Sequence, residues 1–261
     1  MHAPQPPRRE PVLTIPGAML ALIAILCLIH AVRMLLLPPE IDEDIVWMFG
    51  FVPARYDTTV MAGEFPGGFP ASIWSFLTYS LLHADITHIG FNLLWMLPFG
   101  SAVARRFGPT RFFVFLAVSA VAGALAHLLT HQHEVAPMIG ASAAVSGVMA
   151  AAIRFAFQSG SFLSLGNGGA EAAARVPALP LSSALRNGRV LAFLAVWFGF
   201  NLLTGLGAIA IGTQVQSIAW QAHIGGFCAG LLLFSLFDPI PPAGLRTEGE
   251  AGLPPDDSEQ V

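Results

Sequence analysis

The sequence contains few charged residues. Only 11% of its 261 residues are charged, whereas 55% are hydrophobic, and the mean hydropathy is +0.68. A soluble globular domain carries about 25% charged residues. The composition therefore excludes that class and indicates an integral membrane protein, with the lipid bilayer as its surroundings. No basic stripe with interleaved aromatic residues is present, so nucleic acid is not an expected partner.

Cysteine is also scarce. The two cysteines, Cys27 and Cys228, both stand in apolar stretches, so a disulfide framework is not expected. We interpret both as small buried hydrophobic residues. Cys228 follows His223 by five residues. Because that spacing places the two on different faces of a helix, Cys228 is not a candidate nucleophile.

Apolar stretches of membrane length occupy most of the chain. A membrane-spanning helix needs about 20 mainly apolar residues, and about six such stretches predict an all-α polytopic protein with six transmembrane helices. They run over roughly 16–37, within 72–104, and over 111–130, 138–157, 189–209 and 218–237. The first is longer than the apolar core of a signal peptide and lacks a cleavage site after it, so we expect a retained helix.

We predict a membrane domain at 16–237, which contains one long loop and has a disordered tail at each end. Residues 1–15 are polar and rich in proline and should form a disordered tail. Residues 238–261 are acidic and should form a second disordered tail. The loop at about 38–71 is amphipathic, with many aromatic residues, and is expected to lie in the membrane interface rather than cross it.

The basic residues, all of them arginine, predict the orientation. If the N-terminus is cytoplasmic, only Arg33 and Arg55 fall outside. The arginines on the inner side are then Arg8, Arg9, Arg105, Arg106, Arg111, Arg154, Arg175, Arg186, Arg189 and Arg246. The positive-inside rule therefore favours two cytoplasmic termini. In this topology Ser142 and His223 begin parallel helices on the external side, where their side chains can meet.

Ser142 and His223 are the main candidate catalytic residues. Polar groups at membrane depth are costly and usually functional. A lone membrane serine is more typical of helix packing, but a neutral histidine needs a partner, and Ser142 is the best-placed hydroxyl. Gly226 and Gly230 would let the last helix approach the helix of Ser142 closely. We expect Ser142 to act as nucleophile and His223 as general base; the alternative is a packing motif with a hydrogen-bonded core histidine.

His88 and Asn92 are candidates for stabilising an oxyanion. They stand at i and i+4 on one face of the second apolar stretch. An imidazole and an amide are suitable donors for a tetrahedral intermediate, although a hydrogen-bonded pair between helices is the alternative. His83 is interpreted as a supporting or interfacial residue. The histidines at the outer end of the third stretch receive no predicted role: His127, His131 and His133.

These motifs resemble those of the rhomboid family of intramembrane serine proteases. The matching motifs, within roughly residues 45–237, are His83-xxxx-His88-xxx-Asn92, Gly140-Ala141-Ser142, and Ala222-His223-Ile224-Gly225-Gly226 with Gly230. The resemblance implies a Ser142–His223 dyad without an acidic third member. It also implies an oxyanion hole from His88, Asn92 and the Ser142 N–H, and no metal or organic cofactor. The implied substrates are membrane proteins, cut in or near their transmembrane segments, with the loop at 38–71 beside the access route.

Two residues depart from the family pattern. The family usually has glycine directly after the serine, where this chain has Ala143. Ser146 stands where many members carry a tyrosine that supports the histidine ring. Both substitutes are small and neither removes a reacting group, so we expect activity, at a level that these changes can reduce.

Two other functions are weighed against proteolysis. The first is a catalytically weak or inactive rhomboid-like protein that binds transmembrane helices, although such relatives usually lack the serine or the histidine. The second is a histidine-lined transporter or a haem or metal protein. Only His83, His88 and His127 stand at plausible membrane depth, and none of them is expected to have the close i, i+4 His–His spacing that a helical metal site favours. The expected location is a bacterial inner (plasma) membrane; oligomeric state and substrate identity stay open.

Overall fold

The computed structural model describes residues 15–59, 65–158, 174–207 and 219–241, and their regular structure is helical. The α-helices are α1 (Gly17–Leu36), α2 (Pro39–Phe49), α3 (Gly68–Thr78), α4 (Ile86–Phe107), α5 (Pro109–Thr130), α6 (Ser142–Ala152), α8 (Leu181–Ala184), α9 (Gly188–Gly205) and α10 (Trp220–Phe237). Two 3₁₀ turns join them, η1 (Pro53–Tyr56) and η3 (Tyr79–Leu81). The expected tails at 1–15 and 238–261 lie almost wholly outside the described residues.

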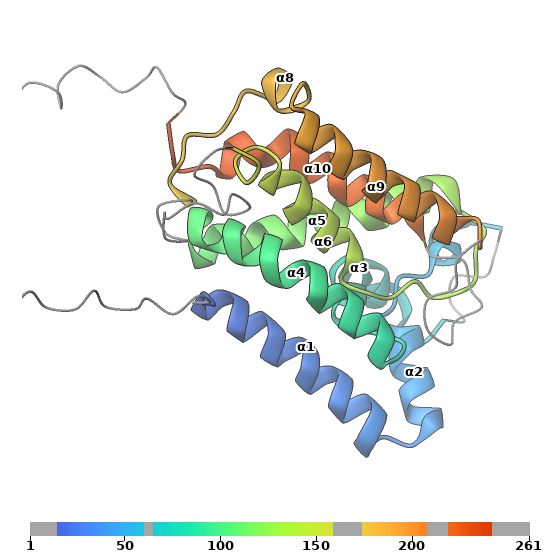
Figure 1. Ribbon diagram of the computed structural model, residues 1–261. Helices are drawn as coiled ribbons and strands as arrows, with labels where there is room; N and C mark the ends of the chain where they lie inside the picture. Colours follow the sequence, from blue (N-terminus) through green and yellow to red (C-terminus); the bar gives the residue numbers. More distant parts are fainter. Residues whose placement is uncertain (1–14, 60–64, 159–173, 208–218, 242–261) are drawn as a thin grey trace, which may run out of the picture.

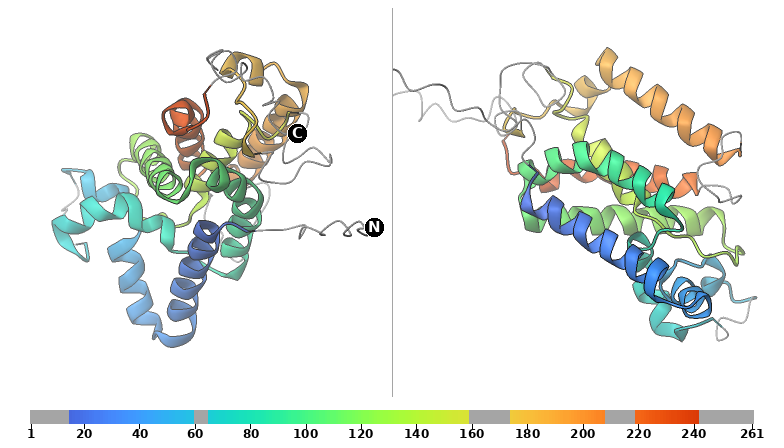
Figure 2. Two further views of the ribbon diagram at one scale, coloured as in Figure 1. Left: turned by 90° about the vertical axis from the view of Figure 1, so that its left-hand side faces the viewer. Right: turned by 60° about the horizontal axis from the view of Figure 1, so that its bottom comes forward.

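Helix α6 lies inside the bundle, packed against α10, α5 and α4. Helix α1 packs on α4 at one edge, and α9 contacts α10 at the opposite edge (Figures 1 and 2). Residues 143–152 of α6 are all buried. This central position places Ser142, the first residue of α6, within the protein rather than on its lipid-facing surface.

Five helices are long and apolar enough to cross a membrane: α1, α4, α5, α9 and α10. The stretch predicted at 138–157 forms a shorter helix, Ser142–Ala152, followed by turns. At 1.5 Å per residue α6 is about 16 Å long, roughly half the thickness of a hydrocarbon core. The stretch at 72–104 is divided as well, because α3 ends at Thr78 and α4 begins only at Ile86.

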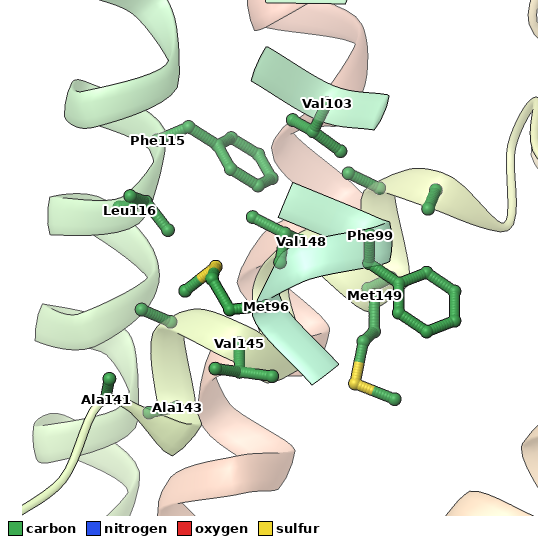
Figure 3. Close-up of a cluster of buried hydrophobic side chains, with 14 of the residues drawn as sticks. Met96, Phe99, Val103, Phe115, Leu116, Ala141, Ala143, Val145, Val148 and Met149 are labelled. Carbon is green, nitrogen blue, oxygen red and sulfur yellow. The ribbon is translucent and has the colours of Figure 1, made fainter. Parts of the chain in front are cut away.

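The apolar core fills the space between α4, α5 and α6. Figure 3 shows Met96 and Phe99 of α4 and Phe115 of α5 around Val148 and Met149 of α6. Small side chains make the remaining contacts of α6, so its backbone approaches its neighbours closely. In a membrane, where apolar burial supplies little driving force, such packing is a main source of helix association.

The closest approach joins α6 to α10. A Cβ atom built at Gly226 would overlap the backbone of Ala143, and one built at Gly230 would overlap the backbone of Gly147. Only hydrogen fits at these two positions of α10. The small pair Gly226–Gly230 therefore has the packing role that the sequence indicates, and it holds the start of α10 beside the start of α6.

We predict that Gly226→Ala lowers the free energy of unfolding by about 1–3 kcal/mol, the usual effect of overpacking. The added methyl group must push α10 away from Ala143. Gly199→Ala is the matched control, since a Cβ at Gly199 meets no atom within 4 Å. Thermal unfolding in detergent measures both variants, and equal stability of the two would contradict the packing argument.

The cysteine prediction is wrong in one respect. Cys27 and Cys228 are free thiols, but both are exposed on the bundle surface rather than buried. The physical reason is that a membrane helix is apolar on its lipid-facing side as well as its inner side. Apolar neighbours therefore do not predict burial as they do in a soluble protein.

Two buried arginines order the segment at 38–71: Arg33 joins it to α1, and Arg55 joins two parts of the segment to each other. Arg33 of α1 forms an ion pair with Asp42 of α2 (Nε–Oδ1 2.6 Å) and donates from Nη1 to the carbonyl oxygen of His83 (2.9 Å). Arg55 donates to the carbonyl oxygens of Trp47 (2.6 Å) and Pro66 (2.8 Å). Helices α2 and α3 lie beside the main bundle (Figure 2) and have 11 residues each, too few to span a bilayer.

Asp57 links the same segment to the loop before α6. Its carboxylate accepts hydrogen bonds from Thr59 N (2.8 Å) and Thr59 Oγ1 (2.6 Å), and it pairs with His133. The bonds from Thr59, and then the one to His133, lower the pKa of Asp57 to about 2. This pKa is below the ordinary carboxyl value of about 4, so the ionised form stabilises the fold.

We predict that this link weakens only in strong acid. Because folding lowers the pKa of Asp57, its contribution is complete above about pH 4 and is lost as the pH falls toward 2. Amide hydrogen exchange of the peptide around Thr59 should therefore differ between wild type and Asp57→Asn near neutral pH and converge in acid. If the exchange rates of wild type and Asp57→Asn differ by the same factor down to the lowest pH, the ionised Asp57 carboxylate is not what stabilises this link.

Candidate active site

Ser142 and His223 meet at the start of their helices. Ser142 is the first residue of α6, and His223 lies in the first turn of α10. The Ser142 Oγ atom is 2.7 Å from His223 Nε2, a hydrogen-bond distance. The close packing of Gly226 on Ala143, one turn further along α10, sets this separation. A hydroxyl and an imidazole in such contact have the geometry of a nucleophile and its base.

Asn201 of α9 contacts the other side of the imidazole. Its Oδ1 atom lies 2.5 Å from His223 Nδ1, and its Nδ2 donates to the carbonyl oxygen of Trp197 (2.8 Å). Because Nδ2 is used by Trp197, Oδ1 faces the ring, and His223 must donate from Nδ1. His223 Nε2 is then the acceptor for the Ser142 hydroxyl, which is the tautomer that a general base requires.

Asn201 was not among the residues selected from the sequence. Its side chain is buried within a candidate membrane span, and a polar residue at such a position is itself a signal of function. The sequence gives no direct link from α9 to α10, however. Only the packing of the two helices shows that Asn201 faces His223.

His88 lies against the turn that precedes Ser142. Gly140 has φ +125°, a conformation that residues with a Cβ rarely adopt. A Cβ at Gly140 would lie 2.6 Å from His88 Nε2, so the imidazole occupies the space that a side chain would need. The His88 ring accepts from Ala84 N at Nδ1 (3.4 Å), which leaves Nε2, the atom beside Gly140, as the N–H donor.

Asn92 follows one turn later on α4. Its Nδ2 atom donates to the carbonyl oxygen of His88 (2.9 Å). An amide nitrogen carries two hydrogens, so this bond uses only one of the two Asn92 N–H groups. His88, Asn92, Ser142 and His223 all line one cavity of about 660 Å³. The structure thus brings together the four site residues selected from the sequence.

The structure accommodates both residues that depart from the family pattern, Ala143 and Ser146. The Ala143 methyl group faces Gly123 of α5, where a Cβ atom would overlap it. A glycine on α5 therefore makes room for the extra methyl. Ser146 donates its hydroxyl to the carbonyl oxygen of Ser142 (2.8 Å) rather than supporting the imidazole.

Three further histidines lie near the site, in two places. His83 is buried before α4 and accepts from Ala141 N at Nε2 (3.4 Å), so it supports the turn ahead of Ser142. His127 and His131 line the cavity together with Glu134, and Glu134 contacts His127 rather than His223. The expectation that none of the histidines at membrane depth has an i, i+4 histidine partner is wrong for His127, because His131 follows four residues later at the end of α5.

Comparison with known proteins identifies a rhomboid domain over residues 70–238. Rhomboid-related protein 3 from Homo sapiens is 33% identical over 81 residues, which are 31% of this chain and 20% of that protein. Rhomboid protease GlpG from Enterobacter sp. (strain 638) is 33% identical over 88 residues, 34% of this chain and 29% of that protein. Putative rhomboid protease YdcA from Bacillus subtilis (strain 168) is 28% identical over 117 residues, 41% of this chain and 54% of that protein. The chain thus spans about a fifth to a half of these relatives' lengths.

Proposed function

Because this chain belongs to the rhomboid family, whose members are generally intramembrane serine proteases, we propose that it is an intramembrane serine endopeptidase. Its substrates would be membrane proteins, hydrolysed at peptide bonds in or near their transmembrane segments. The observation that carries the proposal is the 2.7 Å contact between Ser142 Oγ and His223 Nε2. This contact lies in a cavity of about 660 Å³, enough for an extended peptide segment.

The reaction follows from the two reacting groups. Ser142 Oγ attacks the scissile carbonyl carbon while His223 Nε2 takes the hydroxyl proton. The tetrahedral intermediate collapses when His223 gives this proton to the leaving amine, and an acyl-enzyme ester forms on Ser142. Water then attacks the ester, again losing its proton to His223, and the new carboxyl end leaves as Ser142 recovers its hydrogen.

Three donors would stabilise the oxyanion. They are the Nε2–H of His88, the second N–H of Asn92 and the backbone N–H of Ser142. The first N–H groups of a helix have no partner within the helix and lie at the positive end of its dipole. Ser142 opens α6, so its N–H is in this position.

Asn201 would act as a positioning residue for His223. By accepting from Nδ1 it holds the ring in the tautomer and orientation that face Ser142. Its neutral oxygen replaces the aspartate of a Ser-His-Asp triad, and it supplies the support that a tyrosine at the position of Ser146 would otherwise give.

We predict that Asn201→Leu lowers kcat by about ten- to hundredfold, part of the roughly 10²–10⁴-fold effect of general acid–base catalysis. The KM should change little, because Asn201 orients the base rather than the substrate. Asn201→Asp keeps an acceptor oxygen and should recover activity. A loss of similar size in both variants would assign Asn201 a purely structural role.

The proposed topology has six spans, with the short helix α6 as the fourth and both termini in the cytoplasm. Most of the described arginines lie at the end of the bundle where α4 and α10 end, and only Arg33 and Arg55 lie toward the other end. Among the former, Arg106 forms an ion pair with Asp238 (2.8 Å), and Arg154 donates to Leu179 O (2.7 Å). The positive-inside rule makes this end cytoplasmic. Ser142 then faces the external half of the membrane, and a bacterial inner membrane is the proposed location.

Cleavage of a membrane-anchored reporter tests the proposed function. The purified chain is reconstituted into liposomes with a reporter that has one transmembrane helix, and product masses locate the cut. Cleavage in or beside the helix supports the proposal. Binding of the reporter without any cleavage, across several reporter sequences, would instead favour a helix-binding protein without activity.

A further inference from the structure

Three metal-ligating side chains gather at the outer end of α5. His127 and His131 stand one turn apart, and Glu134 follows in the loop toward α6. One ligand atom from each residue lies within 4.8 Å of the other two, and His127 Nε2 is 3.2 Å from Glu134 Oε2. A tetrahedral ion with bonds of about 2.0–2.2 Å holds its ligand atoms roughly 3.4 Å apart. The separation of 3.2 Å between His127 and Glu134 fits this geometry, and small rotations of the side chains would bring all three atoms to it.

The cluster is held in place by bonds outside it. The Thr130 hydroxyl bonds to His131 Nδ1 (2.8 Å), and the two imidazole rings stack with centroids 4.6 Å apart. Glu134 N donates to His131 O (2.9 Å), while Glu134 O accepts from Ala54 N (2.9 Å). In metal sites, the histidine nitrogen that does not bind the ion commonly has a hydrogen bond of its own, which orients the ring. The bond between Thr130 and His131 Nδ1 is of this kind.

Unpartnered polar atoms in the cluster indicate a missing ligand. In the described part of the chain, His127 Nδ1 is buried without a hydrogen-bond partner, and His127 is only 4% exposed. Glu134 Oε2 is buried as well, and its 3.2 Å neighbour is His127 Nε2, with which it forms no hydrogen bond. Leaving a buried polar atom without a partner is unfavourable. The Ser142–His223 mechanism uses neither residue, so it does not explain this arrangement.

We propose that His127, His131 and Glu134 bind one divalent transition-metal ion of the Zn²⁺ class. Two imidazole nitrogens and one carboxylate oxygen are the donor set that Zn²⁺ takes when a fourth position stays open for water. Magnesium and calcium prefer all-oxygen sites, so they should bind weakly here.

The bound ion would restrain access to the catalytic serine. All three ligands line the cavity that contains Ser142 and His223. The ion would join the end of α5 to the loop that leads to Ser142, so it would make this wall of the cavity less able to move aside for a bound peptide. The structure therefore assigns Zn²⁺ an inhibitory role. This regulatory part rests on the proposed protease function, whereas binding of the ion does not.

Metal titration of the full chain tests the binding. The purified protein is stripped with a chelator and titrated with Zn²⁺ by calorimetry, and with Co²⁺ to follow its visible absorption. One equivalent should bind to wild type and to Ser142→Ala with equal affinity. His131→Gln and Glu134→Gln should each weaken binding by at least about tenfold, given that loss of an outer partner alone costs about 10–100-fold.

His133→Gln is the matched control, because His133 is close in sequence but lies outside the cluster. It should bind the ion like wild type. Equal affinity in all variants, or loss of binding in His223→Ala but not in Glu134→Gln, would overturn the proposed site. Circular dichroism of each variant shows whether its helices are intact.

Inhibition is measured separately, as the ratio of reporter cleavage with and without Zn²⁺ in each variant. Wild type and His133→Gln should be inhibited, and Glu134→Gln should resist the same free Zn²⁺ concentration. One bound equivalent without any effect on cleavage would contradict the inhibitory role. Absence of cleavage in the metal-free wild type would instead contradict the protease assignment, while the titration still decides the metal site.

Discussion

Ser142→Ala and His223→Ala are each expected to abolish peptide hydrolysis while leaving the helical bundle folded. The first removes the attacking oxygen, and the second removes the base that lies 2.7 Å from it. Loss of one member of a serine–histidine pair lowers kcat by as much as about 10⁶-fold, and a second loss adds little. The double variant should therefore be no less active than either single variant.

Ser146→Ala is the matched control for Ser142→Ala. Its hydroxyl lies one turn along the same helix but bonds to the Ser142 carbonyl oxygen rather than to His223. It should retain cleavage of the transmembrane reporter, because only a bond within α6 is lost. Product formation by Ser142→Ala at a rate near that of Ser146→Ala would contradict the assignment of the nucleophile.

The second large effect is expected at the proposed oxyanion hole. Removing one such donor costs about 2.7–4 kcal/mol of transition-state stabilisation, or about 10²–10³-fold in kcat. His88→Ala and Asn92→Ala should each lower kcat by that order and change KM much less. This split arises because the oxyanion exists only in the transition state and the intermediate.

Gly140→Ala should reproduce much of the His88→Ala defect without touching a donor. The new methyl group would meet His88 Nε2 at 2.6 Å, and φ +125° is strained for alanine, so the imidazole must move. Gly90→Ala, on α4 with open space around it, is the control and should stay active. Steady-state cleavage kinetics measure all four variants, and a raised KM with unchanged kcat in His88→Ala would contradict the proposed role.

The sequence predicts that Ser142 and His223 lie together because two independent patterns agree. The arginine distribution and the six apolar stretches predict a topology, and this topology places the two residues at the same ends of parallel helices. The Gly226–Gly230 pair then gives a reason for close contact, and the structure shows the glycines packed on α6. The contact between α6 and α10 can be predicted from the sequence because two helices approach this closely only where small residues face each other.

Other features depend on contacts that one sequence does not show. Asn201 of α9 contacts His223 of α10, two helices whose contact the sequence does not show. The space for the Ala143 methyl group comes from Gly123 of α5. The length of α6 is not readable from hydropathy, because turn residues at both ends are as apolar as the helix itself. Exposure of Cys27 and Cys228 was mispredicted for the related reason that lipid and protein interior select similar side chains.

The most direct test of the central claim is labelling with a serine-reactive fluorophosphonate probe in detergent, which needs no knowledge of the substrate. Wild type is compared with Ser142→Ala and His223→Ala, and peptide mass spectrometry locates the adduct. An activated Ser142 predicts one adduct on Ser142 in wild type and none in either variant. Labelling of Ser142→Ala, or no labelling of folded wild type by any of several probes, would contradict the account.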